Sequence, residues 1–387
     1  MSAAVMTGAR CAISRLRLYR FRNYQAAVVG FGPSLNVIFG SNAQGKTNLL
    51  EAVATLTLTR SPRAASSADL IMWGSTECAV EAAVDRPSGD STLGLRLLRT
   101  DEATRVSRTT TIDGKARSAR GILGVCPVVL FWPEDLQLVK AGPDGRRRLL
   151  DTLLGQLDSR AAAHLLRYRR VLEQRNALLH RIRLDGHGAA ALPGFTEELA
   201  HHGAHVVVAR RSLLVSLAPV ATDVLRDLSA GGERLDLRYA PSFHTTFGDA
   251  DAVERDLREA LRRRADEERA RGITVVGPHR DDVEVVLDDR PARTAASQGQ
   301  QRSIVLAWKV AEMRHIANTC GATPVVLLDD VLSELDRQRR ADLISLLSAH
   351  AGQILVTTTE PVPGLDVFGS VRRFEVRSGT IVEASHD

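Results

Sequence analysis

The fold of this chain is decided by the stretch Val37-Ile38-Phe39-Gly40-Ser41-Asn42-Ala43-Gln44-Gly45-Lys46-Thr47, in which an apolar run leads into a glycine-rich loop. The apolar run predicts a buried strand, and the segment after the loop predicts a helix. The loop itself has the pattern G-x-x-x-x-G-K-T, typical of a phosphate-binding loop. In such a loop, successive backbone N–H groups and the helix N-terminus face phosphate oxygens. We therefore expect every residue from Gly40 to Thr47 to contact a nucleoside triphosphate.

Two side chains of this loop have distinct expected roles. Lys46 would reach the β- and γ-phosphates and serve catalysis, and the Thr47 hydroxyl would take one position around Mg²⁺. The alternative is a chance match in a chain with 29 glycines. The strand before the loop and the helix after it argue against chance.

The composition is that of an ordinary soluble globular protein, with 44% hydrophobic and 25% charged residues. At 387 residues, the chain has enough material for more than one compact unit. A net charge of +5 is compatible with nucleic acid binding but does not demand it. The four cysteines are scattered, which favours a reducing compartment. We see no signal peptide and no apolar run of about 20 residues, so we expect a cytoplasmic protein without a membrane partner.

A second decisive element is Pro324-Val325-Val326-Leu327-Leu328-Asp329-Asp330, four apolar residues followed by two carboxylates. This is the Walker B pattern, in which a buried strand delivers a carboxylate to the metal. We expect Asp329 to join Thr47 as a Mg²⁺ ligand, and Asp330 to position the attacking water as the catalytic carboxylate. Because the two motifs lie far apart in the chain, a large insertion should divide one nucleotide-binding domain.

The region between the motifs is largely helical in pattern. Apolar residues recur at helical spacing from Asp144 to Arg183 and from about Phe195 to Ser229, which predicts an antiparallel helical arm. Arginines on the arm and in the loop after the first helix could contact a phosphate backbone, and the alternative is a solvated surface. The candidates for nucleic acid contact are Arg60, Arg63, Arg167 and Arg170.

Three histidines, His201, His202 and His205, lie within the second helical pattern. Because no acidic partner accompanies them in the sequence, we interpret them as surface residues rather than a metal site.

The remaining segments return to mixed character. Glu233–Tyr239 and Ile273–Gly277 predict strands, and Asp251–Arg271 predicts a highly charged helix. We expect residues 1–133 and 233–387 to form the two parts of one ATPase head, with residues 134–232 as the inserted arm.

A third motif is Ser297-Gln298-Gly299-Gln300, at the start of a predicted helix ahead of the Walker B strand. Ser297 is a plausible N-cap, which is its structural role if it has no other. However, S-x-G-Q in this position is the signature of ABC-type ATPases, where this helix N-terminus faces the γ-phosphate held by the other protomer. Ser297, Gly299 and Gln300 are therefore candidate ATP contacts. Leu332-Ser333-Glu334-Leu335-Asp336 matches the D-loop that follows Walker B.

Taken in order, these motifs resemble the RecF family of the SMC/ABC superfamily over essentially the whole chain. Further matching segments are Phe21-Arg22-Asn23-Tyr24, Pro133-Glu134-Asp135-Leu136, Arg147-Arg148-Leu149-Leu150-Asp151, Gln174-Arg175-Asn176 and Gly277-Pro278-His279-Arg280-Asp281-Asp282. The resemblance implies an α/β fold, an ABC/SMC-type ATPase head of the P-loop class with an inserted helical arm, using ATP and Mg²⁺. It also implies a weak, DNA-stimulated ATPase in a nucleoid-associated protein that forms an ATP-dependent homodimer. Such a dimer acts at single-strand gaps and junctions in DNA and helps RecO and RecR to load RecA.

The chain departs from the pattern in three places. Trp132 stands where relatives often have a small hydroxyl residue, and no clear Q-loop glutamine is present. Thr357-Thr358-Thr359 stands where many relatives carry the switch histidine. Two other classes of protein also carry a phosphate-binding loop. An ABC transporter ATPase would need a membrane partner, and the Arg22-Asn23-Tyr24 region and the arginine-rich arm argue against it. A P-loop kinase would not need the Ser297 signature.

Overall fold

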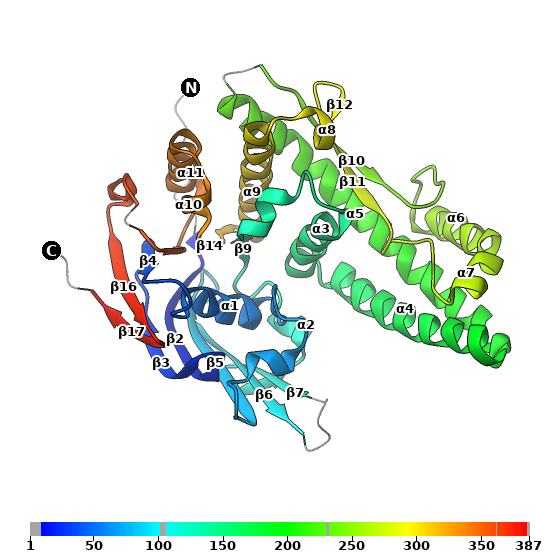
Figure 1. Ribbon diagram of the computed structural model, residues 1–387, viewed down its shortest axis with the longest axis horizontal. Helices are drawn as coiled ribbons and strands as arrows, with labels where there is room; N and C mark the ends of the chain where they lie inside the picture. Colours follow the sequence, from blue (N-terminus) through cyan, green and yellow to red (C-terminus); the bar gives the residue numbers. More distant parts are fainter. Residues whose placement is uncertain (1–8, 101–105, 230–231, 361, 385–387) are drawn as a thin grey trace. The chain divides into compact units, whose positions relative to one another are not determined.

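The computed structural model describes residues 9–100, 106–229, 232–360 and 362–384 (Figure 1). The chain forms two compact units, one of Met1–Leu136 with Val305–Asp387 and one of Gln137–Ile304. Helix α9 (Gln298–Cys320) begins in the second unit and continues into the first.

The first unit contains a six-stranded sheet in the order β17-β16-β4-β15-β14-β9. Its strands are β4 (Leu35–Phe39), β9 (Val128–Phe131), β14 (Val325–Asp329), β15 (Ile354–Thr358), β16 (Val371–Arg377) and β17 (Thr380–Glu383). All neighbours pair in parallel except β16 and β17, which are antiparallel. Every residue of β14 and β15 is buried, as expected for parallel strands covered on both faces. The strands predicted before the phosphate-binding loop and at Walker B are thus confirmed.

A second six-stranded sheet in this unit is antiparallel, in the order β3-β2-β5-β6-β7-β8. Its strands are β2 (Ala12–Phe21), β3 (Tyr24–Gly30), β5 (Glu77–Asp85), β6 (Ser91–Arg99), β7 (Val106–Ile112) and β8 (Lys115–Arg117). Helix α1 (Lys46–Thr57) packs against strands of both sheets, and almost all of its residues are buried. The phosphate-binding loop therefore leads into the hydrophobic core, which holds its helix in place.

Short elements complete the first unit: β1 (Ala9–Arg10) paired with β13 (Ala322–Thr323), η1 (Ser67–Leu70), α2 (Ala119–Ile122), η2 (Pro133–Gln137), α10 (Val331–Glu334), α11 (Arg337–His350) and η4 (Leu365–Phe368).

The second unit is built on long helices. Its elements are α3 (Pro143–Leu157), α4 (Ser159–Asp185), η3 (Ala189–Ala191), α5 (Leu192–Leu228), β10 (Leu235–Ala240), α6 (Ala250–Arg263), α7 (Ala265–Arg271), β11 (Asp282–Leu287), β12 (Arg290–Pro291) and α8 (Ala292–Ala295). Helices α4 and α5 lie side by side, and α6 packs against α5 (Figure 1). The predicted pair of long helices is present.

Three predicted elements differ in detail. The helix expected over residues 144–183 is two helices, because Asp158 has an extended backbone and its side chain accepts hydrogen bonds from the first N–H groups of α4. The charged helix of residues 251–271 is interrupted at Arg264. Residues 273–277 lie outside any strand.

The return to the ATPase head comes later than residue 233. Strand β10 pairs with β11 and packs against α5, and α6 also covers α5. Residues 233–304 therefore complete the hydrophobic core of the helical unit, which extends to Ile304.

Among the described residues, one helical segment, Ala189–Leu228, is long and apolar enough to cross a membrane by length and composition alone. The sequence did not lead us to expect it. Its apolar residues Leu199, Val206 and Leu213 are buried inside the second unit, where α5 packs against α4, α6 and β10. The apolar character of α5 is thus accounted for by its central position in this unit.

A buried ion pair joins α4 to α7. The Arg175 guanidinium lies 2.6 Å from a Glu268 carboxylate oxygen and also donates to the Thr274 hydroxyl at 2.7 Å. Only 2% of the Arg175 side chain and 0% of the Glu268 side chain are exposed.

Glu268→Gln should therefore destabilise the second unit by about 3–5 kcal/mol, because it leaves the Arg175 charge buried without its counter-charge. The control is Asp223→Asn, which removes the exposed pair with Arg226 on α5 and should cost about 0.5 kcal/mol or less. Hydrogen exchange of α4 and α7 peptides in the full chain measures both effects. If the α4 and α7 peptides are equally protected from hydrogen exchange in the two variants, the buried ion pair contributes no more to stability than the exposed pair does.

Candidate nucleotide-binding site

The phosphate-binding loop connects β4 to α1 and requires glycine at its end. Gly45 has a φ of +117° immediately before α1, a backbone conformation that side chains other than glycine rarely adopt. A Cβ atom at this position would lie 2.6 Å from the side-chain nitrogen of Asn23. Both the backbone angle and the lack of space therefore require glycine at this position.

The turn between β2 and β3 supports the loop. Asn23 donates a hydrogen bond from its side-chain amide to the Gln44 carbonyl oxygen at 2.9 Å, and its own oxygen accepts from Asn48. The Tyr24 hydroxyl donates to the Gly45 carbonyl oxygen at 2.8 Å. These contacts use the loop carbonyls and leave its N–H groups for a ligand. The sequence placed this turn within a family motif but did not assign it this role.

A second turn, between β16 and β17, holds the loop through Gln44. The Gly379 N–H donates to the Gln44 carbonyl oxygen at 3.0 Å, and the Ser378 N–H donates to the Gln44 side-chain oxygen at 2.7 Å. Two turns remote in sequence thus fix the shape of the loop before a ligand arrives, which lowers the entropy cost of binding.

Lys46 is the first residue of α1, and its side chain folds back over the loop. Its ammonium donates to the carbonyl oxygens of Gly40 at 2.7 Å and Ser41 at 2.9 Å. Burial lowers the pKa of Lys46, and the nearby carboxylates of Asp330 and Asp329 oppose that change. The loop therefore combines N–H donors with a positive charge, the arrangement that binds phosphate.

Asp329 is brought to Thr47 by the order of the strands. Strand β15 lies between β4 and β14, and its Thr357 is aligned with both Ile38 and Asp329. The Thr47 hydroxyl donates to Asp329 Oδ1 at 2.9 Å, and the Thr357 hydroxyl donates to the same oxygen at 2.7 Å. A carboxylate beside a hydroxyl offers the hard oxygen ligands that Mg²⁺ prefers, so Thr47 and Asp329 fit this ion.

Burial raises the pKa of Asp329, and the hydrogen bonds from Thr357 and Thr47 act in the opposite direction. These two hydroxyls thus favour the ionised form that a metal ligand requires. Thr357 is a functional candidate that the sequence reasoning missed. Its position was noted only as a departure from relatives with a histidine.

Asp330 follows directly and has an unusual backbone for a residue with a side chain, with a φ of +52°. Its N–H donates to the Thr357 hydroxyl at 2.9 Å, and Ser333 donates to its carboxylate at 2.9 Å. The Thr357 hydroxyl therefore contacts both acidic residues: it donates a hydrogen bond to the Asp329 carboxylate and accepts one from the Asp330 N–H.

The signature residues Ser297, Gly299 and Gln300 belong to the second unit, whereas the loop belongs to the first. The Gln300 N–H donates to the Ser297 hydroxyl at 3.2 Å, and the Ser297 N–H donates to the Gln300 side-chain oxygen at 2.7 Å. This reciprocal pair is a capping box at the start of α9. Gln300 also donates to Glu233 at 2.8 Å. The N-cap role considered for Ser297 is thus present.

The four arginines considered for nucleic acid contact are divided between the units. Arg63 lies 3.9 Å from buried Glu51, which also accepts two hydrogen bonds from Arg22, so its charge is partly committed within the protein. Arg60 is half-buried in the same loop. Arg167 and Arg170 are exposed on α4, and no ion pair involves either within the described residues.

Comparison with known proteins identifies a family that the sequence matches. The family model described as RecF/RecN/SMC N terminal domain matches residues 12–363. The chain is 41% identical over 375 residues to the DNA replication and repair protein RecF of Symbiobacterium thermophilum, covering 96% of this chain and 98% of that relative.

Solved structures agree. A structure of the recombination mediator protein RecF-ATP in the RecFOR pathway is similar with a TM-score of 0.85 at 27% identity, covering 99% of this chain and all of that one. A Smc head domain with an extended coiled coil, from Pyrococcus furiosus, is similar with a TM-score of 0.54 at 15% identity, covering 97% of each chain. This second likeness concerns the fold alone. The expected α/β fold, an ABC/SMC-type ATPase head with an inserted helical arm, is confirmed.

Thr357→Val should weaken Mg²⁺-dependent ATP binding by about tenfold, because a hydrogen bond to a charged group contributes about 1.5 kcal/mol or more. Titration with a fluorescent ATP analogue measures the affinity. Thr358→Val is the matched control, since its hydroxyl donates instead to the Glu360 carbonyl oxygen at 2.6 Å. If both variants bind as the wild type does, Thr357 does not support the metal ligand.

Proposed function

The chain belongs to the RecF family of DNA replication and repair proteins, and from this premise we propose that it is an ATP-dependent DNA-binding protein of replication and recombinational repair. One observation carries the proposal. A phosphate-binding loop with its lysine, the oxygen pair of Thr47 and Asp329, and the adjacent carboxylate of Asp330 meet in one compact unit. Similarity to RecF proteins over nearly the whole length supports the same conclusion.

In this proposal each residue of the loop has a role. The N–H groups of Gly40–Thr47 bind the triphosphate, and Lys46 exchanges its loop carbonyls for phosphate oxygens. Thr47 and Asp329 would hold Mg²⁺, which when bound supplies positive charge against the developing negative charge on the phosphates. Asp330 orients the attacking water and accepts its proton. The proposed reaction is slow ATP hydrolysis that DNA stimulates.

We propose that the complete site is shared between two copies of the chain. The capping box holds Ser297 at the start of α9, where the positive end of the helix dipole can meet an anion. In an ATP-dependent homodimer this helix N-terminus would face the γ-phosphate held by the partner protomer.

The proposed DNA substrate is a single-strand gap or a junction of single and double strands. Arg167 and Arg170 are exposed on α4, and Arg60 and Arg63 follow α1, so both units can offer charge to phosphates. The proposed partners are RecR and RecO, and indirectly RecA, because the similar RecF structure is described within the RecFOR pathway. We place the protein in the cytoplasm, associated with the nucleoid and not with a membrane.

Asp330→Asn tests the function. It should slow hydrolysis by about 100-fold or more, since proton transfer is impaired, while Asp329 still binds the metal. The ATP-bound dimer should therefore remain on a gapped duplex longer than the wild-type dimer does. Dissociation rates after dilution into competitor DNA give the comparison, with ADP as control. Failure of wild-type protein to bind gapped DNA in ATP would reject the function itself, and normal dissociation of the variant would reject only the role of Asp330.

Mixed dimers test the shared site. Lys46→Ala impairs the loop, and Ser297→Arg places a bulky cation at a helix N-terminus, where it opposes the dipole. If the signature acts on the partner's ATP, a mixed dimer has both lesions in one site and leaves the other complete. We expect recovery to about half of the wild-type ATPase rate per mixed dimer, since one complete set of charges remains. With mixed dimers verified by differential labels, no recovery would mean that Ser297 acts within its own protomer or not at all.

A further inference from the structure

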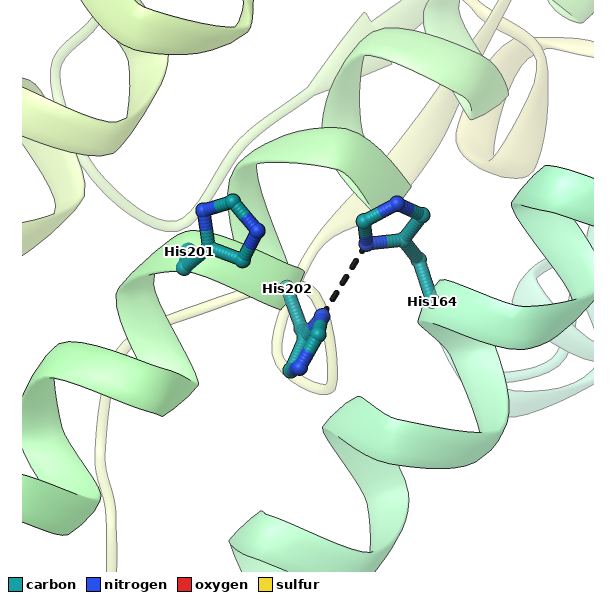
Figure 2. A group of neighbouring side chains, drawn as sticks. All are labelled: His164, His201 and His202. Atoms are coloured by element: carbon teal, nitrogen blue, oxygen red, sulfur yellow. Dashed lines mark hydrogen bonds between the residues drawn. The ribbon is translucent and has the colours of Figure 1, made fainter.

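Four histidine rings gather between two helices of the second unit. His164 is on α4, whereas His201, His202 and His205 are on α5. Figure 2 shows His164 opposite His201 and His202, with a hydrogen bond joining the rings of His164 and His202. The ring of His205 lies against that of His164 at a tilt of 30°, with 4.0 Å between the ring centroids.

The distances within this cluster match those of a metal site. The Nδ1 atoms of His164 and His202 are 3.0 Å apart, and one ring nitrogen from each of His164, His201 and His202 lies within 4.8 Å of the others. A tetrahedral zinc ion with bonds of about 2.0–2.1 Å places its nitrogen ligands about 3.4 Å apart. The His164–His202 separation is slightly below this value, and the 4.8 Å limit for the group is above it, so side-chain rotations would bring the three nitrogens to one ion.

An acidic partner, absent from the sequence pattern, comes from a third helix. Nδ1 of His201 lies 2.9 Å from one oxygen of Glu254 on α6, and the other Glu254 oxygen lies 2.6 Å from Arg258. A carboxylate on one nitrogen of a histidine orients the ring and leaves the second nitrogen for a metal. The tertiary structure therefore supplies the partner whose absence led us to interpret these histidines as surface residues.

Burial favours the neutral form of three of the four rings, His164, His202 and His205. Burial, followed by the neighbouring rings of His205, His202 and His201, lowers the pKa of His164 to about 4. Burial also lowers the pKa of His202 and of His205. Neutral imidazoles have a lone pair to offer, whereas protonated rings repel both one another and a cation.

We propose that His164, His201 and His202 form a binding site for a divalent transition metal, with Zn²⁺ as the ion that fits best. Imidazole nitrogens favour zinc and its neighbours over Mg²⁺, which prefers oxygen. Glu254 orients His201. Water can complete the shell, because His201 is exposed. The ion would join α4 to α5.

Cobalt is the probe that tests the site. The untagged full chain is stripped with a chelator and titrated with Co²⁺ in excess Mg²⁺ without nucleotide, so that the oxygen ligands of the nucleotide site are saturated. We expect visible absorption of a tetrahedral Co²⁺ ion, saturating at one per chain, lacking the thiolate charge-transfer band and abolished by Zn²⁺.

The paired substitution His164→Ala with His202→Ala should remove this absorption. The control is His180→Ala on the same helix, about 24 Å along α4 from His164. Glu254→Gln should weaken Zn²⁺ affinity by about 10–100-fold, as loss of an orienting carboxylate does. Circular dichroism verifies that each variant folds. No cobalt spectrum in the wild type would overturn the proposal, as would an unchanged spectrum in the double variant or equal loss in the His180 control.

Discussion

The hydrogen bond between Thr47 and Asp329 is the contact on which the nucleotide site of the first unit depends. It joins residues 282 positions apart, one at the start of α1 and one at the end of β14. The two elements meet only because β15 pairs with β4 on one side and with β14 on the other. The chain between them leaves the sheet and returns to it, and residues 137–304 of this stretch form a separate unit.

The surroundings of this contact keep the nucleotide site rigid. Thr357 donates to the carboxylate of Asp329 and accepts from the N–H of Asp330, so one hydroxyl positions both acidic residues. Asn23 and Tyr24 hold the other side of the site through the loop carbonyls. Hydrogen-bond donors fixed in advance stabilise developing charge without reorganisation, which is the main source of catalysis in phosphoryl transfer.

Local patterns predicted the parts of the site that depend on local chemistry. The glycine spacing predicted the loop, and the apolar run ending in two carboxylates predicted β14, because both patterns follow from the backbone conformation that they require. Tertiary contacts were beyond the sequence. Thr357 became a candidate only when strand order placed it beside Asp329, and Glu254 joined the histidines only when α6 packed on α5. The boundary at Ile304 was missed for the same reason, since β10 is a strand by pattern yet packs on a helix of the second unit.

We propose that Asp329 and Thr47 together hold the metal that fixes ATP in the loop. Isothermal titration of ATP with and without Mg²⁺, in the wild type and in Asp329→Asn, tests it most directly. The amide keeps the size of the side chain and its ability to accept from Thr47, but removes the charge. The account predicts that Mg²⁺ tightens ATP binding of the wild type by about tenfold or more, whereas the variant loses most of this gain. An equal gain in both proteins would contradict the account.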